Sequence, residues 1–238
     1  MSGLVAAVRL DVALQARNGF YWATAFVVLV VGGLLMAVPE AARADRVAWV
    51  PAVLTINLQI TTFFFVAGLL LLDRDEGVLT ALAVSPLSPG RYLASRTITL
   101  TALATAETIA IVWIAFGAGG SWPLILGGTA ALGTLYTGFG AVVAVRYRSV
   151  NALLLPASMM VIALLLPLLP HLRLAPRAAF LLHPVEPPLT LLRAGYGSGG
   201  PAEVAYGLLG SLVWCAVAFA WGRSGIARLM RDAGAGES

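Results

Sequence analysis

Six long runs of apolar residues constrain this chain more than any other feature of its sequence. Each run has about 20 residues, the length that an α-helix needs to cross the hydrocarbon core of a bilayer. None shows the strict alternation that is typical of a barrel strand. The runs cover residues 20–38, 51–72, 97–116, 123–145, 150–169 and 204–222. The sequence therefore predicts an all-α integral membrane protein with six transmembrane helices.

The composition and the short connections agree with a single domain that is embedded in the membrane. Hydrophobic residues make up 60% of the chain and charged residues 11%, whereas a soluble domain carries about 25% charged residues. The longest connection covers residues 170–203, and the next longest covers residues 73–90. Neither is long enough for a separate soluble domain, so we expect one transmembrane domain over residues 1–238.

The absence of lysine excludes several kinds of chemistry. All 15 basic residues are arginines, and a Walker A loop needs a lysine against the phosphates of ATP. A Schiff base with retinal or pyridoxal phosphate also needs a lysine. The one cysteine, Cys215, lies in the last span and has no partner for a disulfide within the chain. We therefore expect that this chain is not a standard ATPase and forms no Schiff base. We also expect no other cofactor and no metal in this chain.

The distribution of arginines predicts which side of the membrane each connection occupies. Six spans place both termini on one side, and ten of the 15 basic residues lie on that side. The other five are Arg43, Arg46, Arg173, Arg177 and Arg193. Because basic residues are enriched in cytoplasmic loops, both termini and residues 73–90 are expected in the cytoplasm. Residues 170–203 are then expected outside.

Residues 1–19, which precede the first span, are expected to hold an amphipathic helix on the inner membrane surface. In a helix over residues 3–18, one stripe is apolar and the other is polar. The apolar stripe consists of Leu4, Val8 and Val12, and the polar stripe of Asp11, Gln15 and Asn18.

The connection between the second and third spans has an unusually ordered pattern. Residues 73–96 read DRDEGVLTALAVSPLSPGRYLASR. Asp73, Asp75 and Glu76 favour the start of a short helix, because acids in a first turn accept hydrogen bonds from its free N–H groups. Asp73 and Glu76 have the spacing of a capping box. The step Ser85-Pro86 should end this helix, and Ser88-Pro89 should begin the next one.

This segment resembles the loop after the second span of ABC-2 type transporter permeases. In that family the loop is a coupling helix that docks on a cytoplasmic ATP-binding subunit. The resemblance implies that nine residues serve this contact: Asp73, Asp75, Glu76, Gly77, Val78, Leu79, Leu82, Pro86 and Pro89. In residues 170–203, HPVEPPLTLLRAG is similar to the family's stretch of short re-entrant helices, with His183 in place of the usual Asn.

The resemblance also implies a function and its partners. Two permease copies, identical or paralogous, would form a pathway in a bacterial cell membrane. Two separate ATPase subunits, which bind ATP and Mg, would drive export of a hydrophobic or amphipathic drug, antibiotic or lipid-like substrate. In size and in the lack of a nucleotide-binding domain, the chain is similar to actinobacterial permease subunits proposed to export drugs such as fluoroquinolones.

A few polar and aromatic residues inside the spans are candidates for the pathway. Glu107 is the one acid deep in a span, where a charge costs roughly 2.5–3.5 kcal/mol by insertion scales. It could contact a substrate, or it could form a structural hydrogen bond with Asn57 or Gln59 of the second span. Phe64 could line a cavity or face lipid. Two rows of small residues at spacing four in the fourth span indicate close helix packing, and a second permease copy could be the partner. The rows are Ala130, Thr134 and Gly138, and Gly133, Thr137 and Ala141.

Two other function classes remain open at this point. An intramembrane enzyme could use Glu107 or the histidines His171 and His183, although the sequence holds no His-Glu-x-x-His or Gly-x-Ser-x-Gly motif. An ion-coupled carrier should show an inverted repeat with broken helices, and no internal symmetry is evident. No basic cluster suggests binding to nucleic acid. Pro156 and Pro167 should bend or break the fifth span.

Overall fold

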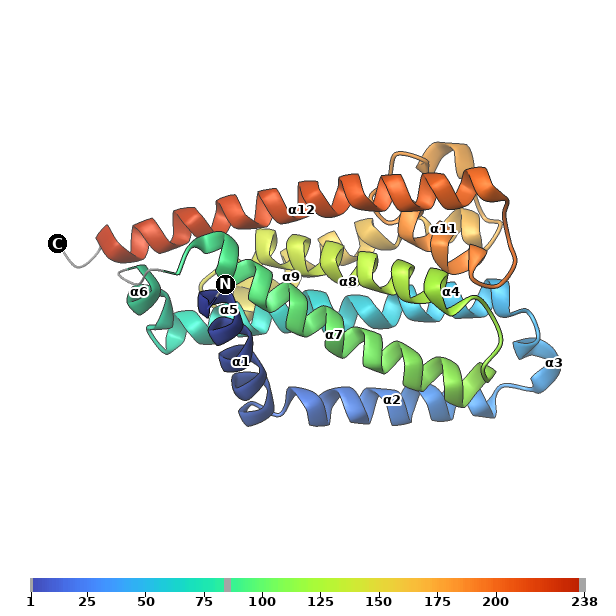
Figure 1. Ribbon diagram of the computed structural model, residues 1–238, viewed down its shortest axis with the longest axis horizontal. Helices are drawn as coiled ribbons and strands as arrows, with labels where there is room; N and C mark the ends of the chain where they lie inside the picture. Colours follow the sequence, from blue (N-terminus) through green and yellow to red (C-terminus); the bar gives the residue numbers. More distant parts are fainter. Residues whose placement is uncertain (1, 84–86, 236–238) are drawn as a thin grey trace.

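The regular elements of the computed structural model are all helices over the residues that it describes, 2–83 and 87–235 (Figure 1). The first half contains α1 (Ser2–Arg17), α2 (Phe20–Ala37), α3 (Glu40–Arg43), α4 (Arg46–Leu58), the π-helix η1 (Gln59–Phe64), α5 (Phe65–Asp75) and α6 (Val78–Ala83). The second half contains α7 (Pro89–Phe116), α8 (Trp122–Ala144), α9 (Val150–Leu165), α10 (Leu168–His171), the 3-10 helix η2 (Arg177–Phe180), α11 (Glu186–Ala194) and α12 (Pro201–Ala235).

Within the described ranges, six helical segments are long and apolar enough to cross a membrane, which confirms the predicted number of spans. They are Phe20–Ala37, Arg46–Asp75, Pro89–Phe116, Trp122–Ala144, Val150–His171 and Pro201–Asp232. The second span is longer than predicted, because α4, η1 and α5 follow one another without a break. In the fifth span Pro156 lies inside α9, and the helix breaks at Pro167, which precedes α10.

Helix α8 is the centre of the bundle and contacts α7, α11, α12 and the second span. Its glycines allow these close approaches. A Cβ atom on Gly138 would lie 2.8 Å from Ala218 Cβ of α12, and one on Gly140 would lie 2.6 Å from the backbone oxygen of Phe63. Gly138 belongs to one of the two predicted rows of small residues, and it packs within the chain, so the suggestion of packing against a second copy is wrong for Gly138.

Helices α2, α9 and α12 lie at the outside of the bundle and expose large apolar side chains. Trp22 is 81% exposed and Leu155 is 71% exposed. Such side chains suit contact with lipid or with another subunit. The elongated bundle has two ends (Figure 1). We call the end with α1, α6 and the end of α12 the α6 end, and the end with α3 and α11 the α11 end.

Helix α1 runs across the α6 end and packs against α7 (Figure 1). Two residues of the predicted polar stripe, Asp11 and Gln15, are buried against the protein, whereas the third, Asn18, is exposed. In the predicted apolar stripe Val12 is exposed, and Leu4 and Val8 are half-buried. The reason is that α7 offers polar partners at this level, so the apolar side of α1 is left for the surroundings.

Candidate functional site

Helix α6 forms between the second and third spans, as predicted, but the acids before it have a different role. Asp73 and Asp75 lie in the last turn of α5, and Glu76 ends that helix. Gly77 then adopts φ +70°, a left-handed conformation that glycine adopts without steric cost. The prediction of an Asp73–Glu76 capping box for α6 is therefore wrong. The apolar run of the second span continues as helix through Asp75, so the acids close α5 and do not open α6.

The other boundary of the segment agrees with the sequence where it is described. Ser88 caps α7, because its hydroxyl accepts a hydrogen bond from Arg91 N at 3.4 Å, and Pro89 occupies the first turn. The predicted helix stop at Ser85-Pro86 lies outside the described residues. Pro86 is therefore the one proposed coupling residue that has no structural description.

The remaining residues of the predicted coupling segment divide into exposed and buried groups. Asp75, Glu76 and Gly77 are exposed, and Glu76 lies 3.8 Å from Arg17 of α1 in a surface ion pair. Val78, Leu82 and Pro89 are half-buried. Leu79 is only 3% exposed, in a helix that packs against α12. One face of α6 is thus fixed to the bundle, and the acidic step before it is open to a partner.

A hollow of about 530 Å³ lies beside α6. Residues of α5, α6, the end of α8 and α12 line it, among them Arg74, Asp75, Arg146, Arg148 and Asp232. Arg74 also donates hydrogen bonds to the backbone oxygens of Val145 and Tyr147, which hold the loop after α8 against α5. The hollow therefore combines fixed walls with charges of both signs, which suits a polar protein partner.

Asp73 does not belong to the exposed group, because it is 2% exposed and forms a buried ion pair. Its Oδ2 lies 2.5 Å from Arg96 Nη2 of α7 and also accepts a hydrogen bond from the Tyr92 hydroxyl. Arg96 Nη1 lies 3.2 Å from Asp11 Oδ1 of α1. We call Asp11, Asp73, Tyr92 and Arg96 the Arg96 cluster.

The Arg96 cluster joins three segments that are distant in sequence. Asp11 also accepts a hydrogen bond from the Ser95 hydroxyl, and Gln15 donates one to Thr99 at 2.8 Å, so α1 is fixed along one side of α7. Burial raises the pKa of Asp11, and this effect outweighs the attraction of Arg96 and the hydrogen bond from Ser95. Sequence reasoning missed this cluster. The one signal in the sequence was Arg96 beside the apolar run of the third span, and this position is typical of a charge at the membrane edge.

Glu107 lies in the middle of the bundle, where Asn57 donates a hydrogen bond to its Oε1. Glu107 is 1% exposed, and its Oε2 has no hydrogen-bond partner among the described residues. The structural alternative, a bond between Glu107 and Asn57, is therefore present. Thr61 of the second span also interacts with the Glu107 carboxylate, so two polar contacts join the second and third spans here.

Gln59 and Phe64, the other pathway candidates, do not join Glu107. Gln59 donates a hydrogen bond to Val161 O of α9 at 3.0 Å. Phe64 is half-buried and lies edge to face against Phe63, with 5.4 Å between the ring centroids. Both residues belong to the π-helix η1, which the sequence did not predict. Its wider turn rotates the polar residues of the second span toward different neighbours.

The α11 end contains a second buried ionic cluster. Glu186, which is 0% exposed, lies 2.7 Å from Arg177 Nε and 2.6 Å from Arg193 Nη2. Arg177 also pairs with Glu203 at the start of α12 and donates to Thr190. These contacts hold η2, α11 and α12 together, so their role in the structure is to fix α11 at this end of the bundle.

The two histidines of residues 170–203 do not approach an acid or each other closely enough for a site. His171 Nε2 lies 2.7 Å from Ala48 O, and His183 Nε2 lies 3.1 Å from Ala163 O. Burial lowers the pKa of His183, although the bond to Ala163 and the charge of Glu186 oppose this shift. No group of three metal-ligating side chains occurs in the described part of the chain.

Comparison with known proteins identifies the kind of transporter. The sequence profile of the Fluoroquinolones export permease protein family matches residues 2–231. Two curated relatives, each called a fluoroquinolones export permease protein, come from two strains of Mycobacterium tuberculosis. Each is 31% identical to this chain over 223 residues, which cover 91% of both proteins.

These matches confirm the resemblance to ABC-2 type drug-export permeases that the coupling segment suggested. They agree with the six membrane-spanning helices of the structure. An export permease in the membrane is the class that the family match supports. The chain belongs to the fluoroquinolones export permease protein family.

Proposed function

We propose that this chain is the membrane-spanning subunit of an ABC exporter that a separate ATPase subunit drives. The family match over residues 2–231 is the observation that carries this proposal. Two copies of the permease, identical or paralogous, form the pathway. The substrate is an amphipathic drug with a planar ring system, of the kind named for the relatives from Mycobacterium tuberculosis.

The ATPase docks at the α6 end, which faces the cytoplasm. Three features support this placement: the exposed Asp75 and Glu76, the left-handed Gly77, and the mixed-charge hollow beside α6. The ATPase binds ATP and Mg, and its closure moves α6. Gly77 lets α6 change direction without breaking α5, because a residue without Cβ rotates most freely.

The Arg96 cluster passes this movement to the spans. Asp73 lies three residues before Glu76 and is ion-paired to Arg96 of the third span. A displacement of α6 that moves the end of α5 therefore also moves α7, and α1 follows through Asp11. Glu107 and Asn57, which lie further along the same two spans, then separate and offer a polar contact to the substrate in the pathway.

A reconstituted complex tests the proposal. We expect a neighbouring gene to encode a P-loop ATPase, and the chain is coexpressed with that ATPase, purified, and placed in proteoliposomes. We expect the two proteins to copurify, and norfloxacin, a fluoroquinolone, to stimulate ATP hydrolysis. Norfloxacin transport by the chain alone without ATP would contradict the proposal and would favour a secondary carrier.

Charge reversal tests the docking surface. The double variant Asp75→Arg/Glu76→Arg should lose stimulated ATP hydrolysis and copurification, because both acids are exposed on the proposed contact. Asp73 is left unchanged, since its reversal would break the Arg96 cluster. Glu40→Arg, an exposed acid at the α11 end, is the matched control and should keep full activity. Wild-type stimulation in the double variant would place the docking surface elsewhere.

A further inference from the structure

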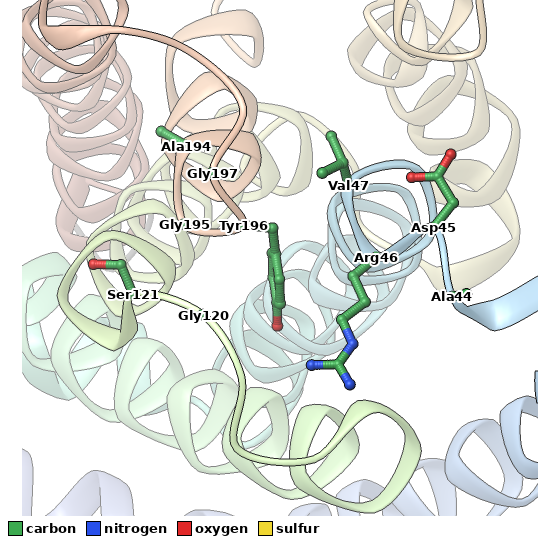
Figure 2. A pocket seen from close by; sticks show the side chains of 10 residues that line it. All are labelled: Ala44, Asp45, Arg46, Val47, Gly120, Ser121, Ala194, Gly195, Tyr196 and Gly197. Carbon is green, nitrogen blue, oxygen red and sulfur yellow. The ribbon is translucent and has the colours of Figure 1, made fainter.

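A pocket of about 580 Å³ opens at the α11 end (Figure 2). It lies between the start of α4, the loop before α8 and the end of α11. Its size suits a drug-sized molecule, since such sites usually measure about 300–1,000 Å³. Ser121 N donates a hydrogen bond to Gly195 O at 2.6 Å, which ties the loop to the end of α11. The pocket is therefore bounded by backbone that is held in place.

Arg46 supplies a cation to this pocket and has no ion-pair partner within the described part of the chain. Its side chain leaves the start of α4 and extends toward the loop that contains Gly120, while Asp45 points away from it (Figure 2). Asp45 instead caps α4 by accepting a hydrogen bond from Ala48 N at 3.1 Å. Glu40 borders a neighbouring hollow that Arg46 also lines. Among the described residues, no acid forms a salt bridge with Arg46.

The glycines of the loop give Arg46 its place. A Cβ atom on Gly119 would lie 2.2 Å from Arg46 Nη1, and one on Gly120 would lie 3.1 Å from Tyr196 Cε1. The guanidinium of Arg46 therefore lies against the backbone at Gly119, and a Cβ atom there would make this exposed end of the side chain shift.

Tyr196 supplies a second donor beside the guanidinium. Its ring points into the same space as Arg46 (Figure 2), and its hydroxyl has no hydrogen-bond partner among the described residues. Burial raises the pKa of Tyr196 to about 12, with the nearby Arg46 opposing the shift, so the phenol keeps its proton at neutral pH. A guanidinium fork and a phenol O–H next to apolar walls are suited to a planar carboxylate.

We propose that Arg46 and Tyr196 form a binding site for the carboxylate of an amphipathic aromatic acid at the α11 end. This inference deepens the proposed function and rests on it, since it assigns the site to substrate that is leaving the pathway. Arg46 pairs with the carboxylate, Tyr196 donates a hydrogen bond to it, and the ring system lies against Val47 and Ala194. The phosphate of an anionic lipid headgroup is the competing anion.

Equilibrium binding of a fluorescent acid tests the site directly. Norfloxacin is titrated into the purified full chain in nanodiscs of phosphatidylcholine, and its fluorescence anisotropy is recorded. Arg46→Gln should weaken binding roughly 10-fold to 100-fold, the effect of losing one charge-assisted hydrogen-bonded contact. The methyl ester of norfloxacin should bind wild type weakly and should be insensitive to Arg46→Gln.

Two further variants separate position from charge. Gly119→Ala keeps every charge but shifts the exposed end of the Arg46 side chain, so it should weaken binding by less than Arg46→Gln does. Arg173→Gln removes an exposed arginine from the same end, outside the pocket, and should bind like wild type. Equal binding by wild type and Arg46→Gln would overturn the site. The site would also be overturned if 10% phosphatidylglycerol in the nanodiscs abolished the difference in norfloxacin affinity between wild type and Arg46→Gln. The lipid phosphate would then be the ligand.

Failure of this inference can be told from failure of the proposed function. If Arg46→Gln binds norfloxacin normally while the ATPase complex is still stimulated by it, only the carboxylate site is wrong. If norfloxacin neither binds nor stimulates, 2-naphthoate is used as a simple aromatic carboxylate. If naphthoate binds and this binding depends on Arg46, the carboxylate site is supported and the proposed fluoroquinolone substrate is refuted. No Arg46-dependent binding of either acid refutes the site.

Discussion

Replacing Arg96 by leucine should destabilise the protein strongly, because it removes the guanidinium between two buried carboxylates. Asp73 and Asp11 have side chains that are 2% and 7% exposed. Breaking a buried pair by removing one partner costs about 3–5 kcal/mol. For a chain of about this size, each kcal/mol lowers the Tm by about 2–4 °C, so the expected fall is about 6–20 °C.

Thermal unfolding of the purified chain in detergent, followed by the fluorescence of its tryptophans, measures this loss. Arg91→Leu is the matched control, since Arg91 is an exposed arginine in the first turns of the same helix. Its free energy of unfolding should stay within about 0.5 kcal/mol of wild type. This comparison separates the buried pairing from a general effect of losing positive charge.

A double-mutant cycle tests whether the loss comes from the pairing with Asp73. The variant Arg96→Leu/Asp73→Leu should be less destabilised than the sum of the two single variants, by about 1–3 kcal/mol, because it leaves no unpaired charge at Asp73. Strictly additive effects would show that Arg96 and Asp73 are not coupled. An Arg96→Leu variant as stable as wild type would refute the assignment of this cluster as a structural link between α5 and α7.

Two further predictions concern packing and the polar pair inside the bundle. Gly140→Ala should destabilise the fold by about 1–3 kcal/mol through overpacking, because its Cβ would lie 2.6 Å from Phe63 O. Gly127→Ala is the control in the same helix. Its Cβ meets open space, so it should be neutral or stabilising. Equal melting temperatures for these two variants would contradict the described packing of α8. Glu107→Gln should keep the Tm, since its amide oxygen still accepts from Asn57, but should lower drug-stimulated ATP hydrolysis if Glu107 contacts substrate. Unchanged stimulation would leave Glu107 as a packing residue only.

The sequence predicted well those features that depend on contact with lipid or on short-range geometry. The six spans could be read directly, because each apolar run must satisfy its own backbone hydrogen bonds as a helix in the bilayer. The start of α7 was also predictable, since Ser88 and Pro89 act on N–H groups within one turn. The coupling segment was recognised as a unit, although its docking role stays a proposal.

Features that depend on which helices meet could not be predicted. Asp73 looked like a cap because Glu76 stands three residues away, whereas its partner Arg96 is 23 residues away and Asp11 comes from the other direction along the chain. The π-helix at Gln59–Phe64 could not be predicted either, because a wider turn has no distinct residue pattern.

The division between sequence and tertiary structure follows the range of the forces involved. By itself, the sequence determined the helical class, the number of spans and the small residues of α8 that allow close approach. Only the tertiary structure decided that Gly138 meets Ala218, that the polar side of α1 faces α7, and that Arg46 and Tyr196 share a pocket. Hydrophobicity acts on each segment alone, but an ion pair or a close contact depends on the arrangement of the whole bundle.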